Sequence, residues 1–202
     1  MSRIGGKSLS ASRVFWLAAL VLSVLVISPF SRAAEAVDAE IMLLFDVSRS
    51  VDAKEYLLQR DGYADAFRDS ALFDAYIAKG RHRRIAVTLM YWSSPDLRRV
   101  ALPWMLIDSR AAAQGFAEAI IKGSAASDGK GLAARPFDGT TAPGSALAFG
   151  FPLFFDNAFE GTRKVMIVSG DGPENAGIPT PKARDEALAA GIDTINTLPI
   201  GS

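Results

Sequence analysis

The sequence predicts an α/β domain with a doubly wound, mostly parallel sheet and helices on both faces of the sheet. Short, continuous apolar runs, such as residues 41–45 and 165–168, alternate with helical patterns along the chain. Apolar runs of this length are typical of strands that are buried on both faces, as in a parallel sheet. Strands that alternate with helices favour a doubly wound arrangement. With 202 residues, half of them apolar, the chain is long enough for one domain with a sizeable core.

Five strands are predicted. Residues 41–45 form the first, residues 85–92 the second and residues 165–168 the fourth. The third, over residues 100–104, contains Pro103, which cannot donate a hydrogen bond to a neighbouring strand. We therefore expect this strand at an edge of the sheet. Residues 192–200 are a weaker candidate for the fifth.

Four helices are predicted between these strands. Asp52 and Glu55 resemble a capping pair in front of a helix whose apolar face carries Tyr56, Tyr63 and Phe67. After Asp108 and Ser109, an apolar residue at every fourth position predicts a second helix, with Ala112, Phe116 and Ile120. The third begins near Pro143 and is kinked or ended by Pro152, and the fourth runs from Thr180-Pro181 to Gly191. Residues 123–136 are predicted to form a loop rich in Gly, Ala and Ser.

The N-terminus resembles a secretory signal. Arg3, Lys7 and Arg13 precede an uncharged apolar run over residues 14–30, and small residues follow it at the spacing that signal peptidase requires. We expect residues 1–36 to be a signal peptide, residues 37–202 to form the domain, and the protein to be periplasmic or secreted. The alternative is an uncleaved anchor, for which the run is short. After cleavage we expect no membrane span.

Charge and composition exclude several classes of function. The formal net charge is zero and the chain has no cysteine. No basic excess points to nucleic acid, and disulfides, cysteine nucleophiles and thiolate metal sites are ruled out. Sequence motifs for a serine hydrolase elbow, a P-loop or a dinucleotide-binding loop are also missing, so we expect no enzyme activity.

Oxygen-bearing side chains gather where predicted strands end. Asp46, Ser48 and Ser50 alternate directly after the first strand, and Asp171 follows the fourth. Ligands of open parallel sheets bind beyond the carboxyl ends of the strands, and alternate residues of an extended turn point the same way. Thr141 adds a hydroxyl just before a predicted helix. Carboxylates and hydroxyls without His or Cys indicate a site for Mg²⁺, Mn²⁺ or Ca²⁺ that keeps a position open for an outside oxygen. A capped turn explains the same residues without a metal.

The pattern of Asp46, Ser48, Ser50, Thr141 and Asp171-Gly172 resembles the metal-ion-dependent adhesion site of von Willebrand factor type A domains. Residues from about 37 to 200 also look like an uncharacterised (domain-of-unknown-function) family of exported bacterial proteins with this domain. The short sequence segments that show this likeness include Gly62-Tyr63, Tyr91-Trp92-Ser93, Asn175-Ala-Gly177 and residues 195–199. The resemblance implies direct metal ligation by Ser48 and Ser50. It implies direct or water-mediated ligation by Thr141, and mostly water-mediated ligation by the two aspartates.

The resemblance also implies a function, although the sequence departs from the family pattern at its C-terminal end. A domain of this kind uses its divalent metal to hold a protein partner that offers an acidic side chain. Type A domains usually continue with another strand and a long helix, whereas this sequence stops at Ser202, so we expect a C-terminally truncated domain. A metal-dependent hydrolase and a degenerate structural domain with a non-functional site are the alternatives.

Overall fold

A computed structural model describes residues 33–122 and 139–201. The predicted signal peptide, up to residue 32, and the whole of the predicted loop over residues 123–136 lie outside the described part. The described residues form one compact unit. Within the described ranges, no helix has both the length and the apolar character needed to cross a membrane.

A five-stranded sheet forms the centre of the domain, in the order β4-β3-β2-β6-β7. Its strands are β2 (Ala39–Asp46), β3 (Ile85–Trp92), β4 (Arg98–Ile107), β6 (Lys164–Gly170) and β7 (Thr194–Pro199). All neighbours are parallel except β3 and β4, which are antiparallel. The strand that contains Pro103 is at an edge, as its sequence predicts. The predicted α/β fold class is confirmed.

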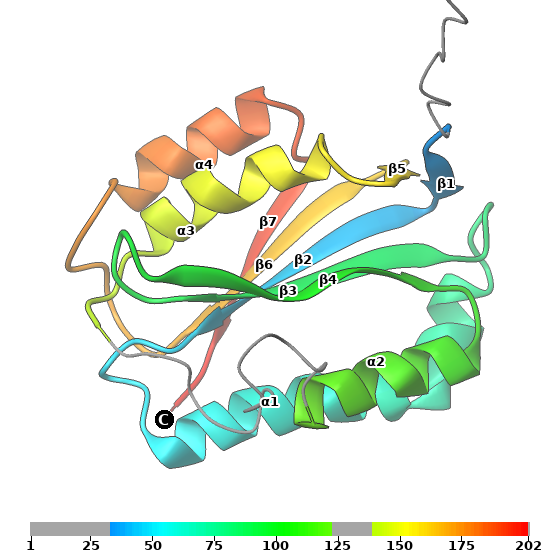
Figure 1. Ribbon diagram of the computed structural model, residues 1–202, viewed down its shortest axis with the longest axis horizontal. Coiled ribbons are helices and arrows are strands. Elements are labelled where there is room, and N and C mark those ends of the chain that lie inside the picture. Colours follow the sequence, from blue (N-terminus) through cyan, green and yellow to red (C-terminus); the bar gives the residue numbers. More distant parts are fainter. Residues whose placement is uncertain (1–32, 123–138, 202) are drawn as a thin grey trace, which may run out of the picture. The chain divides into compact units, whose positions relative to one another are not determined.

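Helices cover both faces of this sheet (Figure 1). One face carries α1 (Ala53–Arg68) and α2 (Arg110–Lys122), and the other carries α3 (Pro143–Gly150) and α4 (Thr180–Ala189). The predicted capping pair is present, because Asp52 and Glu55 each accept a hydrogen bond from the other's backbone amide. Pro152 lies in a 3₁₀ turn, η2 (Phe151–Phe154), that follows α3 directly.

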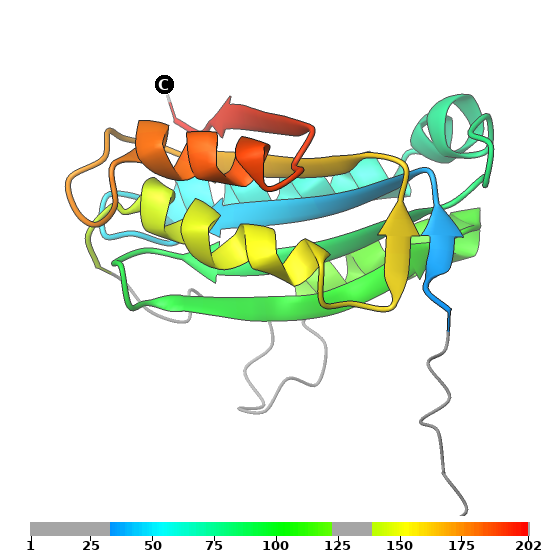
Figure 2. The same ribbon diagram turned by 90° about the horizontal axis from the view of Figure 1, so that it is seen from above.

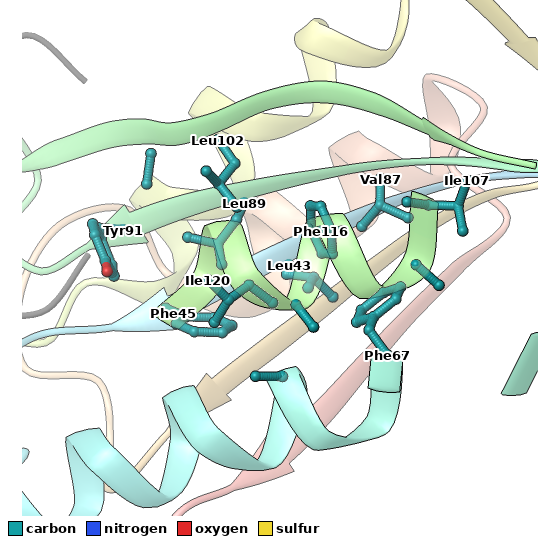
Figure 3. Packing of buried hydrophobic residues seen from close by; sticks show 14 of the residues in the cluster. Leu43, Phe45, Phe67, Val87, Leu89, Tyr91, Leu102, Ile107, Phe116 and Ile120 are labelled. Atoms are coloured by element: carbon teal, nitrogen blue, oxygen red, sulfur yellow. The ribbon is translucent and has the colours of Figure 1, made fainter. Parts of the chain in front are cut away.

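The core has two layers, one on each side of the sheet. Leu43 and Phe45 of β2 pack toward α1 and α2, where Figure 3 shows them beside Phe116 and Ile120. Their neighbours Met42 and Leu44 belong to the layer under α3 and α4. β2 thus contributes side chains to both layers, which explains why its sequence is continuously apolar rather than alternating.

Two features of the fold have no clear signal in the sequence. A π-helical turn, η1 (Leu72–Ile77), follows α1. Two strands of three residues, β1 (Glu35–Val37) and β5 (Phe159–Gly161), pair in parallel beside the main sheet (Figure 2). β1 crosses the expected signal-peptide boundary at residue 36, so the described fold includes Glu35 and Ala36, and the cleavage position stays a prediction.

Candidate metal centre

Two aspartates lie at the carboxyl ends of adjacent strands. β2 ends at Asp46, and Asp171 follows the last residue of β6. The two strands are parallel neighbours, with Phe45 in register with Ser169. Because parallel strands run in the same direction, both carboxylates leave the sheet at one edge, where ligands of open α/β sheets bind.

A chain of hydrogen bonds joins four of the five predicted site residues. The backbone amide of Ser48 donates to Asp46 Oδ1 at 2.7 Å. The hydroxyl oxygens of Ser48 and Ser50 lie 3.1 Å apart, and the Ser50 hydroxyl donates to Asp171 Oδ1 at 2.9 Å. Asp46 and Ser48 are fully buried, whereas Ser50 is exposed. The cluster therefore leads from the protein interior to the surface.

Asp46 is an unusual carboxylate for a buried position. Burial, as the largest influence, raises its pKa to about 6, although hydrogen bonds from Ser48 lower it; the negative charge of Asp171 adds to the increase. Its Oδ2 atom is buried and has no hydrogen-bond partner of normal geometry among the described residues. A buried charged oxygen without a partner is costly, so this atom is placed where a cation would compensate it.

The loop that carries Thr141 lies against the same edge, and the described contacts hold it there through its backbone. The Arg49 amide donates to the Gly139 carbonyl at 2.9 Å, which ties this loop to the segment between Ser48 and Ser50. The Thr141 amide donates to Asn175 Oδ1 at 2.9 Å, and the Asn175 amide donates back to the Thr141 carbonyl at 3.0 Å. Asn175, for which the sequence leaves open both an orienting role and an ordinary turn, therefore links the Thr141 loop to the segment after Asp171.

The neighbouring threonine has a different environment. Thr140 is exposed, and its hydroxyl donates to Ser94 Oγ at 3.0 Å. Thr141 is only 4% exposed. The hydroxyl of Thr140 is thus engaged by the segment after β3, which favours Thr141 as the residue available to the site.

A buried polar network between α1 and the strands β2 and β6 supports the site, and the sequence analysis did not predict it. Gln59 of α1 accepts from the Asp46 amide at 3.2 Å and donates to the Asp46 carbonyl at 3.0 Å. Ser169 of β6 donates to the Leu44 carbonyl at 3.1 Å and also bonds to Gln59 Oε1. A glutamine on the buried face of a predicted amphipathic helix was the one signal available for this network, because such a group must find partners.

Gly170 is required by the closeness of the strands at the site. A Cβ atom at this position would stand 2.9 Å from Asp46 Oδ2. Real Cβ atoms do not approach a neighbouring oxygen so closely, so a side chain here would displace the carboxylate. The glycine lets the two strand ends approach each other.

The donor set at this edge is made of oxygen atoms. Among the described residues, no group of three or more His, Cys, Asp or Glu side chains is arranged to hold a metal. A metal at Asp46 would therefore need the serine and threonine hydroxyls as well as the two carboxylates. Hard oxygen donors of this kind suit Mg²⁺, Mn²⁺ or Ca²⁺.

The single histidine lies at the other end of the sheet. The His82 amide donates to Asp38 Oδ1 at 2.9 Å, and Asp38 precedes the first residue of β2. β2 has eight residues, and a strand rises about 3.3 Å per residue. The length of the strand separates His82 from Asp46, so His82 does not belong to the site.

Solved structures with a similar fold include a matrix protein of the mussel byssus. Proximal thread matrix protein 1 from the mussel byssus, described with a zinc-occupied MIDAS motif, matches 84% of this chain with a TM-score of 0.58 and 21% identity. A second crystal form of that protein matches 83% of the chain with a TM-score of 0.56 and 18% identity. The matched region spans 40% and 38% of the mussel chains, respectively.

A von Willebrand factor type A structure from Catenulispora acidiphila matches 81% of this chain and 33% of its own, with 20% identity and a TM-score of 0.46. No curated protein sequence matches the chain. The model of the family described as "Protein of unknown function (DUF1194)" matches residues 36–202. The fold of the chain resembles that of the mussel matrix protein, and the chain belongs to the DUF1194 family.

Proposed function

We propose that this domain binds a divalent cation through Asp46, Ser48, Ser50, Thr141 and Asp171, and that the site holds an acidic side chain of a protein partner. One observation carries the proposal. The buried carboxylate of Asp46 has one oxygen without a hydrogen-bond partner of normal geometry among the described residues, and it lies in one hydrogen-bonded cluster with two serine hydroxyls and the second carboxylate.

The residues fit a hard divalent cation. Two carboxylates and three hydroxyls offer five oxygen donors, and Mg²⁺ takes about six ligands and keeps some of its waters. The bound ion would supply a coordination position for an outside oxygen. Ser50 is exposed, so such an oxygen reaches the cluster from solvent. Gly170 has no side chain that would displace the Asp46 carboxylate, and Asn175 fixes the backbone of the Thr141 loop.

The mussel protein, whose fold is similar, is described with a zinc-occupied MIDAS motif, which supports the proposal of a divalent cation in this domain. The metal of the present domain is proposed as Mg²⁺, with Mn²⁺ or Ca²⁺ as alternatives. The hydroxyl donors favour these hard ions over Zn²⁺, which prefers His, Cys and carboxylate ligands.

Binding is favoured over catalysis because the site offers no separate general base. A hydrolase needs a group that takes a proton within hydrogen-bond reach of the reacting atom. His82 is at the far end of β2, and both aspartates are part of the proposed metal cluster. We therefore propose that the domain is not an enzyme, with a metal-dependent hydrolase as the alternative reading.

The proposed place of action is the periplasm or the extracellular space, on the basis of the N-terminal signal pattern. N-terminal sequencing of the protein from an expressing bacterium tests this, with the first 33 to 36 residues expected to be missing. An intact Met1 or Ser2 on a cytosolic product would contradict it.

Affinity capture distinguishes adhesion from catalysis. The immobilised protein, incubated with Mg²⁺ and an extract of its own cells, should retain a protein that EDTA releases. The variant with Asp46→Ala and Ser48→Ala should retain none. In parallel, the purified protein should not hydrolyse a panel of phosphate and carboxylic esters. Metal-dependent hydrolysis that disappears in the double variant would favour the hydrolase instead.

A further inference from the structure

A cavity of about 400 Å³ lies beside the candidate metal centre, lined by residues of α3, α4, the strand β6 and the edge strand β7. Gly170 and Gly172, the two residues that flank Asp171, form part of its wall. The cavity and the cluster of acidic and hydroxyl groups therefore share the short segment that follows β6.

The cavity walls are mainly apolar. The apolar members come from the end of β3, from α3, from β6 and from the edge strand β7: Trp92, Pro143, Leu147, Val168, Ile195, Leu198 and Pro199. An apolar surface left open beside a polar binding centre is typical of a recognition site.

Two polar features of the cavity restrict its occupant. Trp92 is only 2% exposed, and its Nε1 atom has no hydrogen-bond partner among the described residues. Arg184 also lines the cavity, but its guanidinium already forms an ion pair with Asp185 at 2.8 Å. Arg184 is therefore already paired with an acidic residue, and apolar side chains make up most of the wall.

We infer that the cavity is a second subsite, which receives a large apolar side chain adjacent to the acidic residue held at the metal. The partner would thus present an acidic residue directly next to a residue such as Phe or Leu. Adjacent Cα atoms are about 3.8 Å apart, which suits two subsites that share the residues around Asp171. This inference rests on the proposed metal-dependent capture of an acidic side chain.

Two short blocked peptides test the inference with the purified full chain: acetyl-Gly-Glu-Phe-Gly-amide and acetyl-Gly-Glu-Gly-Gly-amide. Binding is measured by calorimetry with Mg²⁺ and again with EDTA. The indole N–H signal of Trp92, assigned in nuclear magnetic resonance spectra with Trp104→Phe and Trp16→Phe, reports occupation of the cavity. In Mg²⁺ we expect the Phe peptide to bind about tenfold more tightly than the Gly peptide, from burial of the ring. That peptide alone should shift the Trp92 signal.

A matched pair of variants locates the effect. Thr197 lines the cavity and is exposed on β7, so Thr197→Tyr should fill the cavity and remove the tenfold preference. Asn196 is the next residue of the same strand and is also exposed, but its side chain points to the opposite face of the sheet. Asn196→Tyr should keep the preference. Neither residue belongs to the proposed metal ligands, so both variants should bind Mg²⁺ as the parent does.

The outcomes separate this inference from the function on which it rests. Equal affinity for the two peptides, with Mg²⁺ binding intact, would refute the role of the cavity as a subsite. It would not affect the proposal of metal-dependent capture. Equal binding of the Phe peptide in Mg²⁺ and EDTA would overturn the coupling between cavity and metal. Failure of both peptides to bind a metal-loaded protein would overturn acid capture and the inference with it. Concentration-dependent dimerisation that Thr197→Tyr abolishes would assign the cavity to a second copy of the chain and contradict the inference.

Discussion

Gln59 holds the end of the central strand through two hydrogen bonds with the backbone of Asp46. Its Oε1 accepts from the Asp46 amide at 3.2 Å, and its Nε2 donates to the Asp46 carbonyl at 3.0 Å. Gln59 is 3% exposed and lies on α1, thirteen residues from Asp46. The same side chain bonds to Ser169, so one glutamine connects α1 with the two strands whose ends form the candidate metal centre.

Replacement of Gln59 by Leu should reduce both stability and metal affinity. The change leaves the buried amide and carbonyl of Asp46 without these partners, at a cost of roughly 2–3 kcal/mol. We also expect Mg²⁺ affinity to fall at least tenfold, because supporting residues of metal sites commonly contribute this much. Urea denaturation and calorimetry measure the two effects.

Gln114→Leu is the matched control, because Gln114 is an exposed residue of α2. It should change neither quantity appreciably. If Gln59→Leu lowered stability but left Mg²⁺ affinity at the parent value, Gln59 would be a packing residue without influence on the site.

The stability of the metal-free protein should depend on pH through Asp46. Burial raises the pKa of this carboxyl from 3.8 to about 6. A group whose pKa is raised on folding stabilises the folded state fully below its unfolded pKa, and this contribution disappears as the pH rises through the folded value. Asp46→Asn cannot lose a proton, so the variant should gain about 3 kcal/mol relative to the parent between pH 4 and pH 7.

Urea denaturation in EDTA at several pH values measures this difference. Mg²⁺ added at neutral pH should stabilise the parent and leave Asp46→Asn nearly unaffected, since the charge that holds the ion is gone. Stability curves of parent and variant that stay parallel across this pH range would show that Asp46 ionises normally in the folded protein.

The two adjacent threonines should differ in their effect on metal binding. Thr141→Ala should weaken Mg²⁺ binding without abolishing it, because Thr141 supplies one oxygen of several. Thr140→Ala should have little effect, because its hydroxyl bonds to Ser94. Calorimetry of the two variants side by side tests the assignment. A larger loss for Thr140→Ala would transfer the ligand role to that residue.

A buried carboxylate at the opposite end of β2 has a structural role. Glu40 is fully buried; it accepts from the Gly161 amide at 2.7 Å and from Asn157 Nδ2 at 2.8 Å. Lys164 Nζ lies 3.6 Å from it. Glu40→Ala should lower the free energy of unfolding by about 3 kcal/mol, because it leaves buried donors and a charge unpaired. Metal affinity should not change, since the change is at the other end of the strand.

Glu118→Ala provides the comparison for Glu40. Glu118 pairs with Lys122 at 3.2 Å, but its side chain is 61% exposed. A surface pair of this kind contributes less than about 1 kcal/mol. Equal losses for the two variants in urea denaturation would refute the structural role of Glu40.

Much of this architecture can be predicted from the sequence because its signals are local. The apolar run of β2 and the capping pair of α1 are readable from a few adjacent residues. So is the alternation of Asp46, Ser48 and Ser50. The three-residue strands β1 and β5 are too short to show a pattern, and only their pairing across more than a hundred residues makes them strands.

The supporting residues of the site could not be predicted for a related reason. Gln59 acts through bonds to the backbone of a residue distant in sequence, and a backbone amide gives no sequence signal. The cavity beside Asp171 likewise arises from the packing of five separate elements around the two glycines. Sequence reasoning therefore found the residues that offer oxygen to a metal, but it did not find those that hold them.

Calorimetric titration of the purified protein with Mg²⁺, repeated with Mn²⁺, tests the central claim most directly. The account predicts one bound ion per chain. It also predicts no measurable binding in the variant with Asp46→Ala and Ser48→Ala, while that variant keeps the circular dichroism spectrum of the parent. Absence of binding in the parent, or binding of the same affinity in the folded double variant, would contradict the claim that this cluster is a metal site.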